Sequence, residues 1–281
     1  MERKTISRSL QKVAWVTGAS SGFGALIALE LAKEGYYVYA SARRAEKLSE
    51  IQNDNIQPLP LDVTDEAACE QAMQHIMHEK GRVDVLVNNA GYGLMCPIED
   101  ASMHAIHAQF DVNVFACVKL MQLVTPVMRE QNFGLIINMS SVVGHVSMPL
   151  IGFYAASKHA LEAISDSARN ELYKFGIHVV LVEPGAIQTE FEDVAFSQMD
   201  KAIQTDVYKP LAQKLKKLSN MKYARAPKAA AVANVVQKIA TTNKPKKRYK
   251  VGLDAHFMIP VKNILGDNII DPILRFLLRT K

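Results

Sequence analysis

Three side chains between residues 141 and 158 have the types and the spacing that proton transfer needs. Tyr154 and Lys158 stand four residues apart, which stacks the phenol and the ammonium on one face of a helix. A nearby ammonium favours the phenolate and lowers the pKa of a tyrosine, giving a usable acid or base near neutral pH. The hydroxyl of Ser141, thirteen residues before the tyrosine, could meet the same substrate oxygen if the loop between them folds back over the helix.

A tyrosine and a lysine at this interval also occur by chance, so other elements must support the chemistry. Lys12 to Thr17 is a short apolar run that predicts a buried strand, and a helix-period stretch follows it and ends at Gly35. The turn between them is rich in glycine, which lets the backbone approach a pyrophosphate at the helix N-terminus. This order predicts a dinucleotide-binding loop, with candidate ligands Gly18, Ser20, Ser21, Gly22, Phe23 and Gly24.

The end of the second predicted strand, Tyr36 to Ser41, indicates which dinucleotide binds. NAD-specific folds usually place an acid there for the ribose 2′-hydroxyl, and none stands at residues 41–43. Arg43 and Arg44 follow instead, and the forked donors of arginine suit a 2′-phosphate. The alternative is a solvated basic turn that opens the next helix. We expect NADP(H) in preference to NAD(H), with Arg43 the stronger candidate.

Further strand runs alternate with helical patterns along the whole chain. They are expected at residues 56–61, 83–87, 135–139, 177–182 and 248–251. Such alternation predicts an α/β fold, a Rossmann-type doubly wound parallel sheet of about seven strands in a single domain, residues 1–281. Ligands of such sheets bind beyond the carboxyl ends of the strands, where the small residues Asn89, Ala90 and Gly91 permit close approach.

Composition sets limits on the class of protein. The 281 residues are 49% hydrophobic and carry 33 basic and 28 acidic side chains, a mild excess of +5 that indicates no nucleic-acid role. Three cysteines in apolar contexts predict free thiols in a reducing compartment, and the polar N-terminus is no signal peptide. The sequence contains no run of about 18 apolar residues, which a membrane span would need. It also contains no His, Cys or Asp cluster with metal-ligand spacing. A cytoplasmic, metal-free protein is expected.

Five motifs together resemble the short-chain dehydrogenase/reductase family. TGASSGFG is similar to its cofactor loop, which is spaced differently from the commonest dinucleotide fingerprint. NNAG at residues 88–91, the Asn113-Val pair, Ser-x12-Tyr-x3-Lys, and Pro-Gly-x-x-x-Thr at residues 184–189 follow in the family's order. The resemblance spans residues 13–189 by motif.

The resemblance implies an oxidoreductase acting on an alcohol/carbonyl pair, and it implies a role for each matching residue. Tyr154 would transfer the hydroxyl proton, Lys158 would lower its pKa and bind the nicotinamide ribose, and Ser141 would bond the carbonyl oxygen. Asn113 would support a proton relay through water. Cofactor contacts are further implied for Asp62, Val63, Asn89, Ala90, Gly91, Pro184, Gly185, Ile187 and Thr189. Glu183 departs from the residue expected before Pro184.

The substrate is predicted from the lining of the site. Candidate contacts are mostly apolar, with one imidazole: Tyr92, Leu94, Ser141, His145, Met148 and Phe153. Residues 190–226 resemble the family's variable substrate lid. The sequence is most similar to the branch that includes 17β-hydroxysteroid and retinol dehydrogenases, which implies a steroid-, retinoid- or lipid-like alcohol or ketone.

Several alternatives remain open. A 3-oxoacyl thioester reductase, an extended-family epimerase or a non-catalytic NADP(H) sensor would share parts of the pattern, although the glycine spacing is unlike that of the epimerases. A small-molecule substrate is expected, with no nucleic acid partner. A homodimer or homotetramer is implied by resemblance, through the helix of residues 102–130. The tail, residues 252–281, could pack on the body, cover the substrate mouth, complete an oligomer or touch a membrane surface; membrane contact is not favoured.

Overall fold

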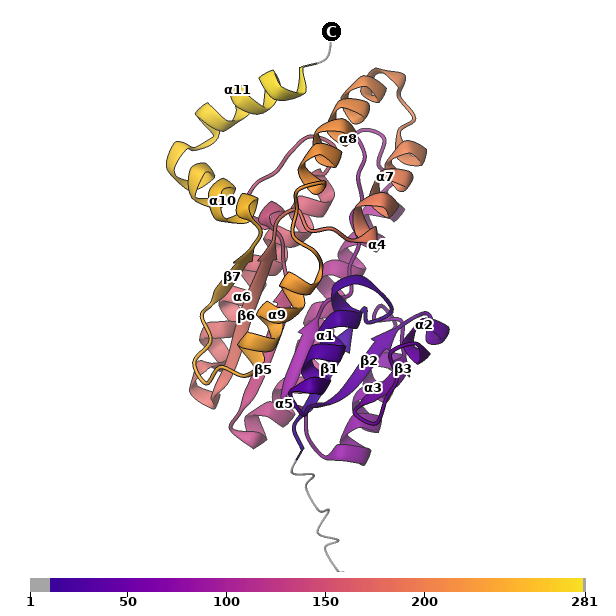
Figure 1. Ribbon diagram of the computed structural model, residues 1–281, viewed down its shortest axis with the longest axis vertical. Coiled ribbons are helices and arrows are strands. Elements are labelled where there is room, and N and C mark those ends of the chain that lie inside the picture. Colours follow the sequence, from indigo (N-terminus) through magenta and orange to yellow (C-terminus); the bar gives the residue numbers. More distant parts are fainter. Residues whose placement is uncertain (1–10, 280–281) are drawn as a thin grey trace, which may run out of the picture.

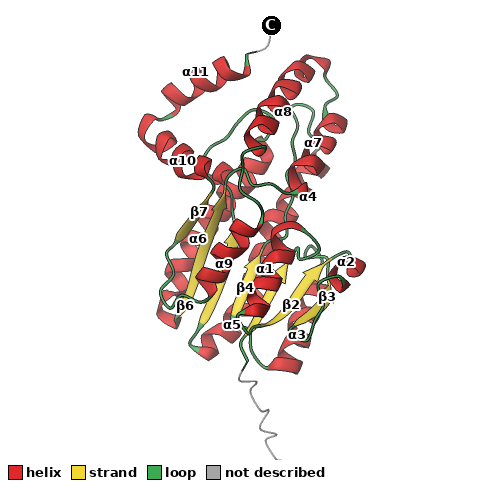
Figure 2. Ribbon diagram, in the orientation of Figure 1, coloured by secondary structure: helices red, strands yellow, loops and turns green. Residues whose placement is uncertain are grey.

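The computed structural model describes residues 11–279, so the predicted polar N-terminus lies almost wholly outside the described residues. Seven strands form one sheet in the order β3-β2-β1-β4-β5-β6-β7, and every pair of neighbours is parallel (Figure 2). The strands are β1 (Val13–Thr17), β2 (Tyr37–Ala42), β3 (Ile56–Pro60), β4 (Val85–Asn88), β5 (Gly134–Met139), β6 (Ile177–Pro184) and β7 (Arg248–Val251). The doubly wound, Rossmann-type sheet predicted from the alternating pattern is confirmed.

Helices cover both faces of this sheet and rise above one end of it (Figure 1). They are α1 (Gly22–Lys33), α2 (Ala45–Ser49), α3 (Glu66–Lys80), α4 (Met103–Phe110), α5 (Ala116–Gln131), α6 (Gly152–Leu172), α7 (Glu190–Ala202), α8 (Lys209–Tyr223), α9 (Ala230–Ala240), α10 (Leu253–Leu265) and α11 (Asp267–Leu278). A π-helical segment, η1 (Asp111–Phe115), joins α4 to α5, and short 3₁₀ turns occur at Val142–Gly144 (η2), Tyr173–Phe175 (η3) and Asp206–Tyr208 (η4).

Alternating side chains of each strand enter two separate cores. In β1, Ala14 and Val16 pack toward α1 and α9, whereas Val13 and Trp15 pack toward α3 and α5. Successive side chains of a strand point to opposite faces, and both faces are covered here. The strands therefore read as continuous apolar runs in the sequence, as buried parallel strands do.

The switch point of the sheet lies between β1 and β4, where the chain order reverses direction. Ligands of doubly wound sheets bind beyond the carboxyl ends of the strands at this point. The loops after β1, β4, β5 and β6 all reach this edge, and they carry the predicted motifs. The helices α7, α8, α10 and α11 stand beyond the same edge (Figure 1).

The helical run Met103–Gln131 differs from expectation in its apolar character. By length and composition it could cross a membrane, although no such run was expected from the sequence. Its inner side packs Leu120, Val124 and Met128 against the sheet, and a core helix of this kind meets the same criterion. Pro126 lies inside α5 and does not end this helix.

The three cysteines Cys69, Cys96 and Cys117 are buried and unpaired, as predicted. The tail is helical and only partly packed. Ala255 and Ile259 of α10 enter a cluster with Val142 and Val143, and Leu278 of α11 packs against the α7–α8 region. Of the four roles left open for the tail, packing on the body is thus established for one side of each helix.

Candidate active site

The glycine-rich turn after β1 is too tight for side chains at two positions. A Cβ on Gly24 would lie 2.3 Å from the carbonyl oxygen of Gly18, and one on Gly18 would lie 2.8 Å from the Cα of Ala90. Gly18 and Gly22 also have φ angles of +65° and +56°, which non-glycine residues rarely adopt. The turn therefore brings bare backbone to the start of α1.

The first turn of α1 offers free amide donors. Ser21 precedes the helix, and its side chain makes no capping hydrogen bond. The first N–H groups of the helix thus keep the capacity and the dipole that favour an anion. A Cβ on Gly22 would meet no atom within 4 Å, so the approach is open. These features fit the pyrophosphate of a dinucleotide.

Residues after the neighbouring strand β4 are hydrogen-bonded to this turn. The Thr17 hydroxyl accepts hydrogen bonds from the amides of Asn89 (3.0 Å) and Ala90 (3.1 Å). The Asn89 side chain donates to the carbonyls of Thr17 (2.9 Å) and Gly18 (3.2 Å). The two loops on either side of the switch point are thereby fixed to each other, which places Ala90 and Gly91 beside the glycine turn.

The two arginines after β2 take different positions. Arg44 donates to the hydroxyls of Ser20 (3.1 Å) and Ser21 (3.4 Å) and so braces the glycine turn. Arg43 is exposed, and its charge acts on Asp62. Burial would raise the pKa of Asp62, but hydrogen bonds from Thr64 and the charge of Arg43 outweigh it and lower that pKa. Arg43 therefore lies on the adenosine side of the predicted cofactor site, near Asp62 and buried Val63.

Tyr154, Ser141 and Lys158 meet where β5 ends beside α6. The Ser141 hydroxyl lies within hydrogen-bond reach of the Tyr154 phenol and of the Pro184 carbonyl (3.3 Å). Lys158 is 6% exposed and donates to the Met139 carbonyl at 2.7 Å. Its ammonium lies 5.9 Å from the centroid of the Tyr154 ring. Ser140 points elsewhere, beside Gly144 and Glu162.

The acidity of this pair differs from the sequence expectation. Burial raises the pKa of Tyr154 to about 12, and the hydrogen bond from Ser141 opposes this shift. Burial also lowers the pKa of Lys158, because the charged ammonium loses water. Contrary to the sequence expectation, the pKa of Tyr154 therefore lies above that of a free phenol, because desolvation is the largest effect on it. Tyr154 is a protonated phenol at neutral pH.

Asn113 lies in the π-helical segment η1, where the widened turn displaces its side chain from the α-helical register. The buried amide donates to the Tyr92 carbonyl (3.0 Å) and to Ser157 (3.1 Å) and accepts from the Tyr92 amide (3.1 Å). A Cβ on Gly91 would lie 3.0 Å from Asn113 Oδ1 and 3.8 Å from Lys158 Nζ. The amide is thus fully bonded and lies close to the lysine.

The Pro184–Thr189 segment lies between β6 and α7. A Cβ on Gly185 would collide with the carboxylate of Asp254, which also accepts from the Ala186 amide (2.9 Å). Ile187 is buried, and the Thr189 hydroxyl accepts from the Phe191 amide (3.3 Å) at the start of α7. Thr189 therefore caps the lid helix from the position predicted to contact the cofactor.

The predicted substrate residues divide into two groups. Tyr92, Met148 and Phe153 are partly buried and Leu94 is buried, and Met148 joins an apolar cluster with Tyr154. His145 instead directs Nε2 toward two carboxylates, Glu183 Oε1 at 3.2 Å and Glu162 Oε2 at 3.7 Å. The carboxylate of Glu183 raises the pKa of His145. One ring nitrogen is therefore engaged in a buried ion cluster.

Glu183, unexplained by the sequence, is the centre of that cluster. Its Oε1 lies 3.0 Å from Arg248 Nε, and the same guanidinium lies 2.9 Å from Glu162. His145, Glu162 and Glu183 have the types and proximity of metal ligands, although no sequence spacing indicated it. Arg248 already supplies the cation that these carboxylates need, so we assign the cluster to an ion-pair network.

The match with known proteins agrees with this geometry. Residues 12–200 match the model of the short chain dehydrogenase family. The chain belongs to the short-chain dehydrogenase family. It is 35% identical over 263 residues to the probable short-chain type dehydrogenase/reductase VdlC of Helicobacter pylori, covering 94% of this chain and 96% of that one. It is 34% identical over 271 residues to the NADPH-dependent 3-dehydrocapnine reductase of Ornithobacterium rhinotracheale, covering 93% and 95%.

Solved structures of the family share the fold. A short-chain dehydrogenase from Streptomyces avermitilis superposes with a TM-score of 0.81 at 30% identity, covering 97% of this chain and 99% of that one. The closed form of serine dehydrogenase complexed with NADP⁺ gives a TM-score of 0.75 at 28% identity, covering 85% and 94%. The chain is thus a family oxidoreductase over nearly its full length.

Three site residues were missed by the sequence reasoning. Gln109 is fully buried and holds the Tyr92 carbonyl (2.7 Å) and the Leu94 amide, which fixes the loop beneath the substrate region. Phe191 of the lid lies with its ring centroid 5.8 Å from that of Tyr154. The Thr17 hydroxyl joins the loops after β1 and β4 by hydrogen bonds. Of these, only Thr17 lay in a motif; the others act through contacts that no local spacing reveals.

Proposed function

We propose that this oxidoreductase uses NADP(H) to interconvert an apolar ketone or aldehyde with its alcohol. One observation carries the proposal: Tyr154, Ser141 and Lys158 lie together beside the glycine-rich turn after β1. That turn would fit a dinucleotide. Support for NADP(H) comes from Arg43, with no acid at residues 41–43, and from the NADP⁺-bound and NADPH-dependent relatives. A dinucleotide at the glycine-rich turn would be held by Gly18, the first turn of α1, Ala90 and Lys158.

The proposed chemistry assigns each protein group one task. When bound, NADPH supplies the hydride. The protonated Tyr154 phenol gives its proton to the carbonyl oxygen as charge develops there. Ser141 donates a hydrogen bond to the same oxygen and stabilises that charge. Lys158, held at the end of β5, favours the phenolate that remains, and the bonded Asn113 fixes the loop beside the lysine.

The substrate is proposed to be bulky and apolar, of steroid, retinoid or lipid type. Support comes from the apolar clusters beyond Tyr154, formed by Leu150, Met148, Phe196 and Met199 with partners from α8, α10 and α11. Phe191 closes over the Tyr154 ring. A polar substrate would lose its hydration here without gaining matching bonds.

The test is oxidation of NADPH and of NADH with a panel of carbonyl compounds: steroid ketones, retinal, medium-chain aldehydes, an acetoacetyl thioester and a quinone. We expect NADPH-linked turnover of one apolar class. The Tyr154→Phe variant should bind NADPH normally yet lose at least about 100-fold in kcat. Retained turnover in this variant would refute the mechanism. NADPH binding without turnover of any compound would favour the sensor, and turnover confined to the thioester would favour the 3-oxoacyl reductase.

We also infer a homodimer or homotetramer that uses the exposed side of α4 and α5. Met103 of α4 is 64% exposed there, and Phe115, the last residue of η1 before α5, is 57% exposed. Light scattering on the purified protein, with Phe115→Ser as the variant, measures this directly. A monomer at all concentrations would contradict the inference.

A further inference from the structure

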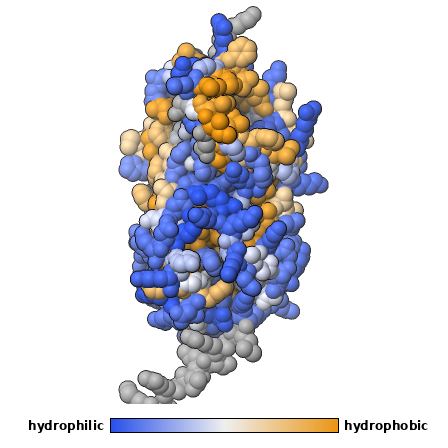
Figure 3. All heavy atoms as spheres, turned by 90° about the vertical axis from the view of Figure 1, so that its left-hand side faces the viewer, coloured by the Kyte–Doolittle hydropathy of each residue, from blue (hydrophilic) through white to orange (hydrophobic). Residues whose placement is uncertain are grey.

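The tail helices expose a second apolar side that faces away from the body. On α10, Leu253, Phe257, Val261 and Ile264 recur at helical spacing with exposures of 78%, 67%, 39% and 80%. On α11, Ile269, Ile273, Phe276 and Leu277 do the same, and Phe276 is 76% exposed. Together these eight side chains define the tail patch. It is visible as the hydrophobic cluster in the upper part of Figure 3.

The tail patch is not needed to hold the helices in place. The opposite sides of α10 and α11 carry the buried Ala255, Ile259 and Leu278, which already pack on the body. Gly266, with φ +65°, lies between the two helices and turns the chain there. The pair projects from the body as an arm (Figure 1). An apolar surface of this extent on a projecting arm indicates a binding surface.

Positive charge is concentrated in the chain immediately before this arm. Residues 207–253 contain 13 lysines and arginines and no acidic residue. Since the whole chain has a net charge of only +5, the remainder of the protein is acidic overall. The segment comprises the lid helix α8, which contacts α11, and the edge of the sheet that leads into α10. The basic segment therefore adjoins both helices of the arm.

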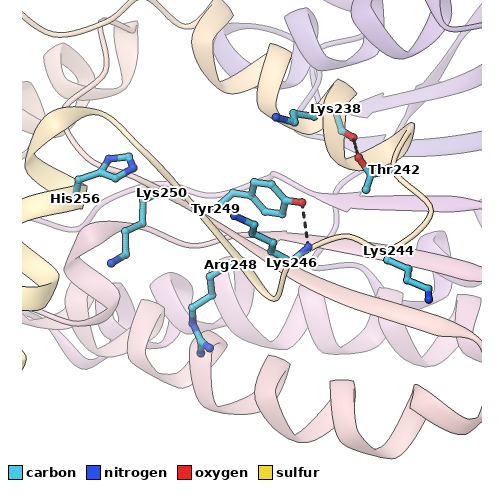
Figure 4. A pocket seen from close by; sticks show the side chains of 8 residues that line it. All are labelled: Lys238, Thr242, Lys244, Lys246, Arg248, Tyr249, Lys250 and His256. Carbon is cyan, nitrogen blue, oxygen red and sulfur yellow. Dashed lines mark hydrogen bonds between the residues drawn. The ribbon is translucent and has the colours of Figure 1, made fainter.

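Part of this charge lines a groove at the sheet edge, shown in Figure 4. The groove has a volume of about 470 Å³, and its lining includes Lys238, Lys244, Lys246, Lys250 and His256 of α10. Within residues 11–279, none of these four lysines has a carboxylate within ion-pair distance, unlike Arg248. The groove thus presents uncompensated positive charge next to the apolar arm.

We propose that the tail patch and the basic groove bind the surface of an anionic lipid bilayer. The apolar side chains of α10 and α11 would enter the boundary between headgroups and acyl chains, and the lysines would meet the lipid phosphates. A second copy of the chain suits this face less well. A symmetric contact through the patch would bring the basic segments of the two copies together, and residues 207–253 contain no acid to pair them.

The arm also adjoins the active site. A cavity of about 230 Å³ lies between the loop that joins β5 to α6 and the helix α11. Its lining includes Ser147, Met148, Pro149, Leu274, Arg275 and Leu278. A bilayer at the tail patch would therefore place lipid beside the substrate side of Tyr154. The idea that the bilayer supplies the substrate rests on the proposed function. The binding of the bilayer itself is independent of that function.

The test is sedimentation of the full chain with phosphatidylcholine vesicles and with vesicles that also contain phosphatidylglycerol. No substrate or cofactor is present, so failure here leaves the proposed function untouched, and loss of carbonyl turnover leaves this result untouched. We expect binding to the anionic vesicles only, and weaker binding when NaCl rises from about 0.1 to about 0.5 M.

Two variants separate the two parts of the surface. Phe257→Ser with Phe276→Ser should weaken vesicle binding by at least about tenfold. Lys244→Gln with Lys246→Gln and Lys250→Gln should abolish the preference for anionic lipid. Tyr173→Ser is the matched control, because Tyr173 is 78% exposed on η3, outside the patch, and its loss should change nothing. Circular dichroism checks that each variant is folded.

Three outcomes would overturn the proposal: no binding to anionic vesicles, binding that the double serine variant retains, or equal binding to neutral vesicles. Light scattering without lipid tests the second copy as the occupant. Oligomers that disappear in the Phe257→Ser, Phe276→Ser variant, together with no vesicle binding, would assign the tail patch to self-association.

Discussion

The ammonium of Lys158 bonds the Met139 carbonyl at 2.7 Å and lies 5.9 Å from the centroid of the Tyr154 ring. The end of β5 therefore fixes the position of the lysine. Burial is the largest effect on the Tyr154 phenol and raises its pKa to about 12. The phenol is thus prepared to donate a proton, as carbonyl reduction requires.

This acidity can be measured without cofactor. We expect that ultraviolet titration of the wild type minus Tyr154→Phe shows no tyrosinate from Tyr154 up to about pH 10.5, whereas an unperturbed phenol would be more than half ionised there. A raised pKa means that the protonated form persists below it, so the difference signal should develop only at higher pH. A step near pH 7 to 8 would show that the Lys158 charge outweighs burial.

Arg43 is expected to discriminate between the two cofactors. Arg43→Ala should weaken NADPH binding by about 10- to 100-fold through loss of a charge-assisted contact with the 2′-phosphate, and NADH binding far less. Fluorescence titration measures both affinities. Arg44→Ala is the matched control, because Arg44 braces Ser20 and Ser21 in the loop that both cofactors share. Its loss should weaken both to a similar degree. Equal losses in Arg43→Ala would contradict the assignment.

Gly24 is expected to tolerate no side chain. In Gly24→Ala the new Cβ would lie 2.3 Å from the Gly18 carbonyl and 2.6 Å from Asn89 Nδ2, so the clasped loops must move apart. We expect a loss of about 1–3 kcal/mol in the free energy of unfolding and at least about tenfold in NADPH affinity.

Gly81→Ala provides the control for this effect. Gly81 has φ +68° and open space around it at the end of α3, so alanine there should cost stability through backbone strain alone. NADPH affinity should remain unchanged. A Gly24→Ala protein with wild-type affinity would show that the start of α1 does not hold the cofactor.

Arg248 is expected to be the main compensation for two buried carboxylates. Arg248→Met leaves Glu162 and Glu183 without their guanidinium, and breaking a buried ion pair costs about 3–5 kcal/mol. Urea unfolding at pH 7 measures the loss. Lys250→Met, on the same strand and without an ion pair to any residue of 11–279, should stay within about 0.5 kcal/mol of the wild type.

The deficit of Arg248→Met should shrink in acid. Burial raises the pKa of Glu162, and a raised pKa in the folded state means that folding takes up a proton. Stability of this variant therefore falls as pH rises from the usual range of a glutamate through its folded-state pKa, and it recovers as pH decreases. A deficit that is constant between about pH 4 and pH 7 would show that these carboxylates are not the cause.

Much of the fold and of the candidate site was predictable from the sequence, because the signals are local. Buried parallel strands are continuous apolar runs, so the seven-stranded sheet could be predicted from them. Gly18 and Gly24 are required by a turn of a few residues, and Tyr154 and Lys158 share a helix face because of their interval. Such features depend on backbone geometry over short distances, which residue types and spacing express directly.

The tertiary structure decided what depends on burial and on distant residues. The sign of the Tyr154 pKa shift follows from desolvation by elements far apart in the chain. Glu183 contacts Arg248 and His145 only because the fold brings β6, β7 and the loop after β5 together. The amphipathic pattern of α11 shows that it has an apolar side, but only packing determines that this side faces outward. Burial is a property of the whole assembly of elements, and no local pattern contains it.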